Sequence, residues 1–295
     1  MLHSLRLYNT GFCFQREFLL AGGGRMVTVA IPVYVAVLQH PTAGTILFDT
    51  GYAGHYFDAT QHFPFRMMST ILPVAIKAKW TIAAQLAASG IAPAEVQWIM
   101  LSHLHNDHVA GLKDFPSAKI VCKRSGYYDG MLRLSDFNQA RKGFLPALLP
   151  DDFEARSTFI EDLPAMTEVP PFGPCVDFLG DGSILFIPLE GHCRGQIGAL
   201  LTMADGRQVL LAADACYLSR SLRTGKGPPW ITQLAADDPK AAQLTLDRLR
   251  QFGEAHPEVP VIPSHCGEAA YLYPEWFVEK PVYEGRPVAG VEEKG

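Results

Sequence analysis

Several features that would assign the chain to a special class of protein are missing. The six cysteines show no C-x-x-C spacing, which excludes a disulfide framework for a chain of this size and favours a reducing cytoplasm. No apolar run approaches the length of a membrane span, and the first residues lack the pattern of a signal peptide. Charged residues make up only 19% of the chain, the net charge is −5, and no lysine- or arginine-dense block occurs. We therefore expect no nucleic-acid and no membrane partner.

Hydrophobic residues are plentiful, at 48% of 295 residues, as in ordinary globular proteins. This length allows one large domain. We predict a single domain over residues 1–295, with a motif-bearing core at about 30–266 and a loosely attached tail at 277–295. The proline-punctuated segment 135–172 is interpreted as an insertion that shapes substrate access.

Hydrophobic patterning predicts an α/β protein in which strands alternate with helices. Helices are expected over residues 76–89, 125–134 and 238–256. Segment 52–75 is rich in aromatic residues and methionine without a clear period, which favours local packing, with an apolar lid over a site as the alternative. Strands are expected over residues 4–8, 26–38, 45–48, 96–102, 119–123, 176–179, 184–188, 197–203, 208–213 and 259–263.

The stretch 103–108 joins the end of a predicted strand to the start of a predicted helix and carries four metal-ligand side chains. Imidazole nitrogen and carboxylate oxygen bind zinc and similar metals. His103 and His105 can point the same way because side chains alternate along an extended chain, which leaves Asp107 and His108 free to face a second metal. A histidine-rich solvent loop is the alternative, but five of the ten histidines stand at metal-motif positions.

Three further ligand-type residues each follow a predicted strand. These are His192, Asp214 and His265. Polar packing would explain any one of them, but several strand ends that converge on one rim would bring all of them to the histidine cluster. Asp49 also ends a strand, and we interpret it as an acceptor that fixes the tautomer of a ligand histidine, with a plain turn residue as the alternative.

The order His103-x-His105-x-Asp107-His108, His192, Asp214, His265 resembles the metallo-β-lactamase superfamily. The resemblance covers roughly residues 30–266 and implies an αββα sandwich, two mixed sheets with helices outside. It also implies two Zn²⁺ or other divalent transition metals, one held by His103, His105 and His192, the other by Asp107, His108 and His265, with Asp214 bridging both. Departures from the family pattern at Cys193–Gln196 and Ser264 bear on the substrate rather than on the metals.

Such a pair of metals, about 3.5–4 Å apart, can share a hydroxide, because metal binding lowers the pKa of water to about 7. No clear G-x-S-x-G elbow is present, so a serine nucleophile is not expected. Cys193, Cys216 and Cys266 adjoin proposed ligands. We interpret them as small packing residues, with a thiolate close to zinc as the alternative.

Tyr217, three residues after Asp214, resembles the substrate-contacting tyrosine of the N-acyl-homoserine lactone lactonases, which are quorum-quenching enzymes. The resemblance implies that Tyr217 contacts the substrate. We expect a bridging hydroxide to open the lactone, Tyr217 to assist by a hydrogen bond to the carbonyl, and Asp107, as a metal-held carboxyl, to protonate the leaving alkoxide. The expected substrate is a small molecule whose apolar tail lies on segment 52–75, and a homodimer is one allowed assembly. The alternatives are core packing of Tyr217, a glyoxalase II-type thioester hydrolase, another ester or phosphodiester hydrolase, and a non-catalytic metal-binding module.

Overall fold

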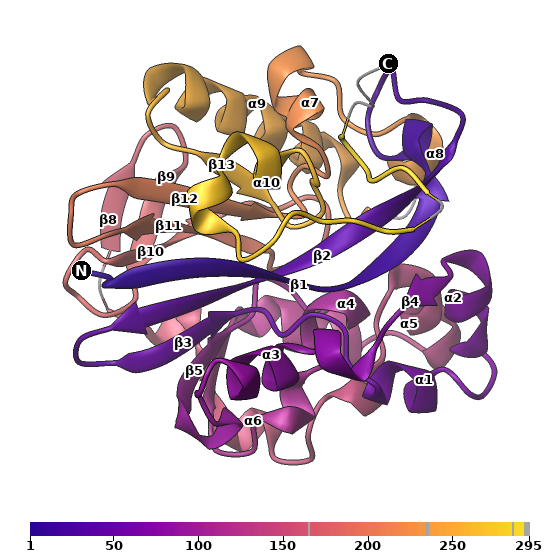
Figure 1. Cartoon of the computed structure of the whole chain (residues 1–295), viewed down its shortest axis with the longest axis horizontal. Coiled ribbons are helices and arrows are strands. Elements are labelled where there is room, and N and C mark those ends of the chain that lie inside the picture. Colours follow the sequence, from indigo (N-terminus) through magenta and orange to yellow (C-terminus); the bar gives the residue numbers. More distant parts are fainter. Residues whose placement is uncertain (165, 234–235, 285, 292–295) are drawn as a thin grey trace.

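Two β-sheets packed face to face, with helices on both outer sides, make up the computed structural model of the chain (Figure 1). The structure describes residues 1–164, 166–233, 236–284 and 286–291. In these ranges the strand order is β4-β1-β2-β3-β5-β6-β7 in one sheet and β13-β12-β11-β10-β9-β8 in the other. The first sheet consists of β1 (Ser4–Arg16), β2 (Thr28–His40), β3 (Gly44–Phe48), β4 (Val74–Ala75), β5 (Val96–Met100), β6 (Lys119–Cys122) and β7 (Ser157–Phe159). The second consists of β8 (Met166–Val169), β9 (Gly173–Asp177), β10 (Ile184–Pro188), β11 (Ile197–Thr202), β12 (Gln208–Ala213) and β13 (Val261–Pro263).

Residues of the second sheet alternate between two apolar layers, as the period-two geometry of a strand requires. In β10, Ile184 and Phe186 belong to the core between the sheets, whereas Leu185 and Ile187 belong to a second core on the outer face. Leu246, Leu249 and Phe252 of α9 close that outer core. Both faces of β10 are therefore buried, which explains its nearly continuous apolar sequence.

The helices lie outside the two sheets, with α7 and α9 on one side and α3 and α6 on the other (Figure 1). Asp238 begins α9 by accepting hydrogen bonds from the backbone N–H groups of Lys240 and Ala241. None of the helices in the described ranges is long and apolar enough to cross a membrane. The α-helices of the described residues are α1 (His55–Ala59), α2 (Arg66–Ile71), α3 (Ile82–Ala88), α4 (Asn106–Val109), α5 (Asp136–Lys142), α6 (Phe153–Arg156), α7 (Ser219–Thr224), α8 (Trp230–Gln233), α9 (Pro239–Ala255) and α10 (Ala269–Leu272).

The segment after Trp276 is attached more firmly than the sequence predicts. The backbone N–H of Val278 donates to the carbonyl of Leu7, and that of Ala289 donates to the carbonyl of Ala30. Val288 and Ala289 are buried. The prediction of a loosely attached tail is therefore wrong for the described residues up to 291, because the backbone there pairs with β1 and β2.

Segment 135–172 is also different from the insertion that the sequence predicts. It contributes β7, which pairs with β6 in the first sheet, and β8, which pairs with β9 in the second. The segment is thus the crossing from one sheet to the other. It does approach the ligand cluster, because Gly143, just after α5, lies beside His105.

Candidate metal centre

Strands from both sheets end at one rim, and the ligand-type residues follow those ends. β3 and β5 run parallel in the first sheet, and β12 and β13 run parallel in the second. β10 has the same direction as β12, because each is antiparallel to β11. His103, His105, His192, Asp214 and His265 therefore come together although up to 162 positions separate them in the sequence, which is 265 minus 103.

The first group of candidate ligands consists of three imidazoles. His103 Nε2 lies 3.0 Å and His192 Nε2 lies 3.1 Å from His105 Nδ1. A zinc ion that is bound tetrahedrally at about 2.0–2.1 Å holds its nitrogen ligands about 3.3 Å apart. Two of the three nitrogen–nitrogen distances thus nearly match the spacing that one zinc ion requires, and all three atoms lie within 4.8 Å of one another.

The second group combines carboxylates with imidazoles. His265 Nε2 lies 3.3 Å from Asp107 Oδ2 and 3.2 Å from Asp214 Oδ1. His108 Nε2 lies 3.4 Å from the same Asp214 atom. The other oxygen of Asp214, Oδ2, faces His192 Nε2 at 3.5 Å. Asp214 consequently turns one oxygen toward each group, as a bridging ligand would.

Hydrogen bonds outside the two groups fix which nitrogen each ring presents. His108 Nδ1 donates to Asp49 Oδ2 over 2.7 Å, and His265 Nδ1 donates to the carbonyl of Pro32 over 2.9 Å. Ser102 Oγ donates to the same Asp49 oxygen over 2.8 Å and lies 3.0 Å from His103 Nδ1. These partners leave the Nε2 lone pairs of the three histidines directed into the site.

Positive backbone φ angles occur at two ordinary residues of this rim. Asp49 has φ = 66° at the end of β3, and Ala213 has φ = 46° immediately before Asp214. L-residues rarely adopt this left-handed region, and the strain collects at functional sites. Here the sharp bends turn the carboxylates of Asp49 and Asp214 toward the histidines.

Burial and charge set the pKa values in the first group. Burial lowers the pKa of His103 and His192 and lowers the pKa of His105 to about 3, because the charged form loses its water and neighbouring histidines repel it. These imidazoles are therefore neutral at physiological pH, the form in which histidine binds a metal.

Carboxylates reverse this effect in the second group. Burial alone lowers the pKa of both histidines, but carboxylates outweigh it and raise both pKa values well above the usual 6.5. Asp49 is the largest of these influences on His108, and Asp214 is the largest on His265. Burial likewise opposes ionisation of Asp107, yet His108 and His265 lower its pKa to about 2. The second group therefore places ionised carboxylates against imidazoles whose positively charged form is favoured.

Two observations test whether these residues fit a cation. His108 Nε2 and Asp214 Oδ1 are buried and, although only 3.4 Å apart, neither atom forms a hydrogen bond among the described residues. This arrangement is costly unless a positive ion pairs with both atoms. Gly143 closes the other side, where a Cβ would stand 3.2 Å from the His105 ring. The donor atoms, the unpaired atoms and this tight enclosure all fit divalent metals.

The six cysteines do not contribute to the candidate metal groups of the described residues. All six are buried as free thiols. Burial raises the pKa of Cys193, Cys216 and Cys266, so these side chains stay protonated. This favours the packing interpretation over a thiolate ligand.

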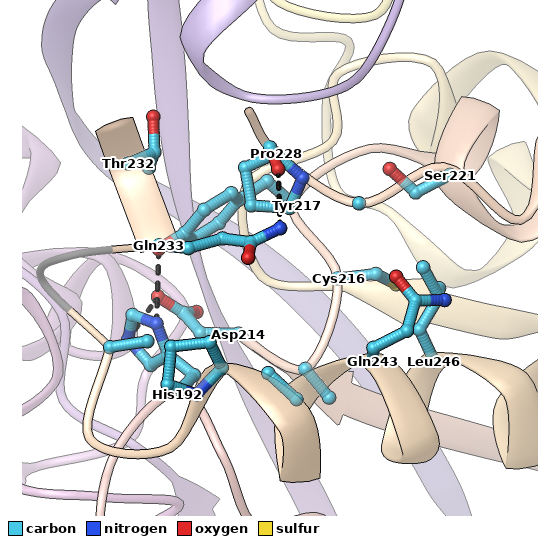
Figure 2. A pocket seen from close by; sticks show the side chains of 15 residues that line it. His192, Asp214, Cys216, Tyr217, Ser221, Pro228, Thr232, Gln233, Gln243 and Leu246 are labelled. Carbon is cyan, nitrogen blue, oxygen red and sulfur yellow. Dashed lines mark hydrogen bonds and ion pairs between the residues drawn. The ribbon is translucent and has the colours of Figure 1, made fainter. Parts of the chain in front are cut away.

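Tyr217 connects the site to a neighbouring pocket. Its hydroxyl oxygen lies 3.0 Å from His192 Nδ1. Burial raises the pKa of Tyr217 well above 10, which keeps the phenol protonated. Figure 2 shows His192 and Asp214 at one end of this pocket and Tyr217 in its wall.

The sequence analysis missed Ser102, the carbonyl of Pro32 and Gly143. Ser102 could have been suspected because it precedes His103 directly at a strand end. A backbone carbonyl or a glycine carries no comparable chemical signal. The seven predicted ligands, in contrast, all belong to overlapping sets of side chains that could hold a metal. These sets are the three histidines of the first group, then Asp107, His108 and His265, and a third set of His103, His108 and Asp214 that links the two.

Face-packed sheets with histidine and aspartate ligands at one rim define an α/β sandwich with a metal centre at the sheet edge. A family model described as the metallo-beta-lactamase superfamily matches residues 29–265. The chain therefore belongs to the metallo-beta-lactamase superfamily, and the αββα fold implied by the resemblance is confirmed.

Several relatives of this chain are named N-acyl homoserine lactonases. N-acyl homoserine lactonase AttM of Agrobacterium fabrum is 26% identical over 242 residues, which cover 81% of this chain and 83% of the relative. N-acyl homoserine lactonase AiiB of the same organism is 23% identical over 229 residues, 77% of each chain. These relatives bear out the expected likeness to the N-acyl-homoserine lactone lactonases.

Solved structures agree on the fold. An N-acyl homoserine lactone hydrolase with the product N-hexanoyl-L-homoserine at its catalytic metal centre has a TM-score of 0.69 at 20% identity, covering 94% of this chain and 99% of the other. AidC, described as a dizinc quorum-quenching lactonase, has a TM-score of 0.63 at 15% identity, covering 100% and 97%.

Proposed function

We propose that this chain is a dinuclear metal-dependent hydrolase that opens the ring of N-acyl-homoserine lactones. The observation that carries the proposal is the convergence of seven ligand side chains into two adjoining groups that share Asp214. Relatives named as lactonases, similar over more than three quarters of the chain, favour this substrate class over a thioester or a phosphodiester.

His103, His105 and His192 would hold one metal, and Asp107, His108 and His265 the other, with one oxygen of Asp214 turned toward each. Zinc suits these nitrogen and oxygen ligands. When bound, divalent metals supply Lewis acidity, which polarises a carbonyl and makes water acidic enough to attack near neutral pH.

Tyr217 is assigned two connected tasks. If His192 offers Nε2 to a metal, its Nδ1 carries the proton and donates to the Tyr217 oxygen across the 3.0 Å contact. The phenolic proton is then free to point into the pocket and to hydrogen-bond the lactone carbonyl oxygen as negative charge develops there. Tyr217 thereby orients a ligand and contacts the substrate.

Asp107 is assigned the proton transfer. Its carboxylate is at the more accessible side of the second group, with a side-chain exposure of 14% against 1% for His108. Attack by water releases one proton, and ring opening leaves an alkoxide that requires one. The Asp107 carboxylate would accept the first proton and deliver it to the ring oxygen, which balances the reaction.

A substrate panel tests the proposal. Metal-loaded protein would be supplied separately with an N-acyl-homoserine lactone, a thioester, a phosphodiester and a β-lactam, and hydrolysis would be followed by acid release or absorbance. We expect rapid opening of the lactone and slow or no turnover of the others. Fast cleavage of the thioester or phosphodiester without lactone opening would contradict the lactonase assignment.

A further inference from the structure

A pocket extends from the candidate metal centre into the space between α7, α8 and α9. His192, Asp214 and Tyr217 line its inner end, and Ser221, Gln243 and Leu246 line the opposite end (Figure 2). Its empty volume is about 520 Å³, including the part open to solvent. A molecule whose reacting bond lies at the metal ligands could thus extend an arm past Tyr217 into this space.

The walls of the pocket are mostly small and apolar. Ala215, Ala242, Pro228 and Pro239 contribute short side chains, and Leu246 contributes a larger buried one. Cys216 adds a small buried side chain. Such walls accommodate a slender, uncharged arm.

Apart from Asp214 Oδ1 at the metal end, one buried side-chain polar atom of the pocket lining has no hydrogen-bond partner among the described residues. The Ser221 side chain is 1% exposed, and its hydroxyl is without a hydrogen-bond partner among the described residues. Figure 2 shows its oxygen turned toward the side of the pocket where Pro228 and Tyr217 lie. A buried hydroxyl without a partner is unfavourable, so a ligand atom that pairs with Ser221 would relieve this cost.

The opposite rim offers less enclosure for the arm of a substrate. In segment 52–75, Tyr52, Tyr56 and Met68 are buried in the larger of the two apolar cores. Phe63, which the sequence places under the substrate's tail, is 74% exposed. Local packing therefore accounts for Tyr52, Tyr56 and Met68, whereas Phe63 lies on the surface.

We propose that the pocket between α7, α8 and α9 binds the acyl arm of the substrate, and that Ser221 selects arms carrying an oxygen substituent, a keto or hydroxyl group. This inference rests on the proposed lactonase function. The small apolar walls surround the methylene groups, and the Ser221 hydroxyl hydrogen-bonds the substituent. An unsubstituted arm leaves that hydroxyl unpaired and is the poorer substrate.

The test compares kcat/KM for N-(3-oxohexanoyl)- and N-hexanoyl-homoserine lactone in metal-loaded protein. We expect the wild type to prefer the oxo substrate, and Ser221→Ala to reduce that preference about five- to tenfold, the effect of one hydrogen bond. Ser219→Ala is the matched control, because Ser219 is a buried serine of the same helix whose hydroxyl contacts Cys266. It should leave the preference unchanged.

A second comparison locates the arm independently of Ser221. Ala242→Leu narrows the pocket, so it should lower kcat/KM for N-hexanoyl-homoserine lactone relative to γ-butyrolactone, which has no arm. Phe63→Ala on the opposite rim should leave that ratio unchanged. The reverse pattern would place the arm over segment 52–75 and overturn the inference.

Thermal stabilisation of the protein by the ring-opened products measures binding without turnover. The oxo product should raise the unfolding temperature of the wild type more than the unsubstituted product does, and Ser221→Ala should remove that difference. If lactones are opened but Ser221→Ala and Ser219→Ala show the same substituent preference, the pocket assignment is wrong while the lactonase proposal stands. If metal-loaded wild type opens none of these lactones, both proposals fail.

Discussion

Asp49 is not a metal ligand in the proposed site, but its carboxylate holds the ligand His108 and the neighbouring Ser102 in place. One of its oxygens accepts hydrogen bonds from His108 Nδ1 and from Ser102 Oγ, and the other accepts from the Ser102 backbone N–H. Its left-handed backbone makes this possible by turning the carboxylate back from the end of β3. A partner of this kind fixes the ring orientation of a metal-binding histidine and increases its basicity.

Replacing this carboxylate should weaken the metal centre. Asp49→Asn keeps the shape of the side chain but removes the charge, so His108 is held less firmly and is a weaker base. We expect metal affinity to fall by about 10- to 100-fold, measured by competition with a chelator of known affinity. Asp181→Asn is the control, because Asp181 also pairs with a histidine, His40, outside the candidate metal groups. Equal affinities for the wild type and Asp49→Asn would remove Asp49 from the proposed site.

The Tyr217 hydroxyl should affect turnover more than metal content. Tyr217→Phe removes the acceptor for His192 Nδ1 and the donor to the lactone carbonyl while it preserves the ring. Because polarisation of the carbonyl would be shared with a metal, we expect kcat to fall by about tenfold, less than the usual cost of losing an oxyanion donor. Steady-state kinetics of lactone opening provide the measurement. An unchanged kcat would leave Tyr217 with a packing role only.

At the scale of elements, the loop that follows β1 supports the wall of the pocket. The N–H of Gly22 donates to the carbonyl of Gly227, and Thr232 Oγ1 donates to the carbonyl of Leu19. Within the loop, Glu17 accepts hydrogen bonds from the backbone and guanidinium of Arg25, the shortest over 2.7 Å. The ion pair therefore stabilises a segment that contacts α8 and the residues before it.

This pair predicts a pH-dependent stability. Burial opposes ionisation of Glu17, but the Arg25 hydrogen bonds outweigh it and lower the pKa of Glu17 below 4.5. A lowered folded-state pKa stabilises the protein above the unfolded pKa of about 4.3, and this contribution is lost as the pH falls through the folded pKa. Glu17→Gln should cost about 1 kcal/mol in the free energy of unfolding at pH 7 and less near pH 4. Urea unfolding at both pH values measures it, with the exposed Glu258→Gln as control. A cost that is equal at both pH values would contradict the ion-pair account.

Sequence patterns predicted regular elements better than irregular ones. Residues 184–188 form the strand that their apolar run predicts, because both faces of β10 are buried. The predicted helix at 76–89 instead begins at Ile82, where Thr81 caps it. β1 continues to Arg16 beyond a bulge between Asn9 and Phe12, whereas the apolar pattern predicted its end at residue 8. The bulge depends on pairing with β2, which is distant in the sequence, so a local pattern does not reveal it. The cap is local, because Thr81 Oγ1 accepts from the backbone N–H of Ala84, but the apolar pattern alone does not mark it.

For the whole molecule, the candidate site depends on the two sheets ending at the same rim. The ligand residues could be predicted because histidine and aspartate have a distinct chemistry at each strand end. The pocket could not be predicted, since its lining comes from several segments between His192 and Leu246 that are brought together only by the packing of α7, α8 and α9. The alanines, prolines and glutamines that line the pocket form no sequence pattern that predicts a binding site.

Asp214 joins the two ligand groups, so its replacement should reduce metal binding while the protein still folds. Asp214→Ala should retain little metal and lose roughly a hundredfold or more in turnover. The core between the sheets is apolar and should still unfold cooperatively, as judged by thermal unfolding. Asp205→Ala is the control, because Asp205 is an exposed aspartate with its partner Arg207 in the turn between β11 and β12. Full turnover by Asp214→Ala would exclude the proposed bridging role.

The central claim is that two metals, bound by these seven residues, open a lactone. It is tested most directly by adding Zn²⁺ stepwise to metal-free protein and measuring the rate of N-hexanoyl-homoserine lactone opening by acid release. We expect the rate to rise until two equivalents of Zn²⁺ per chain are bound and then to remain constant. A rate that becomes constant at one equivalent, or no lactone opening at any metal content, would contradict it.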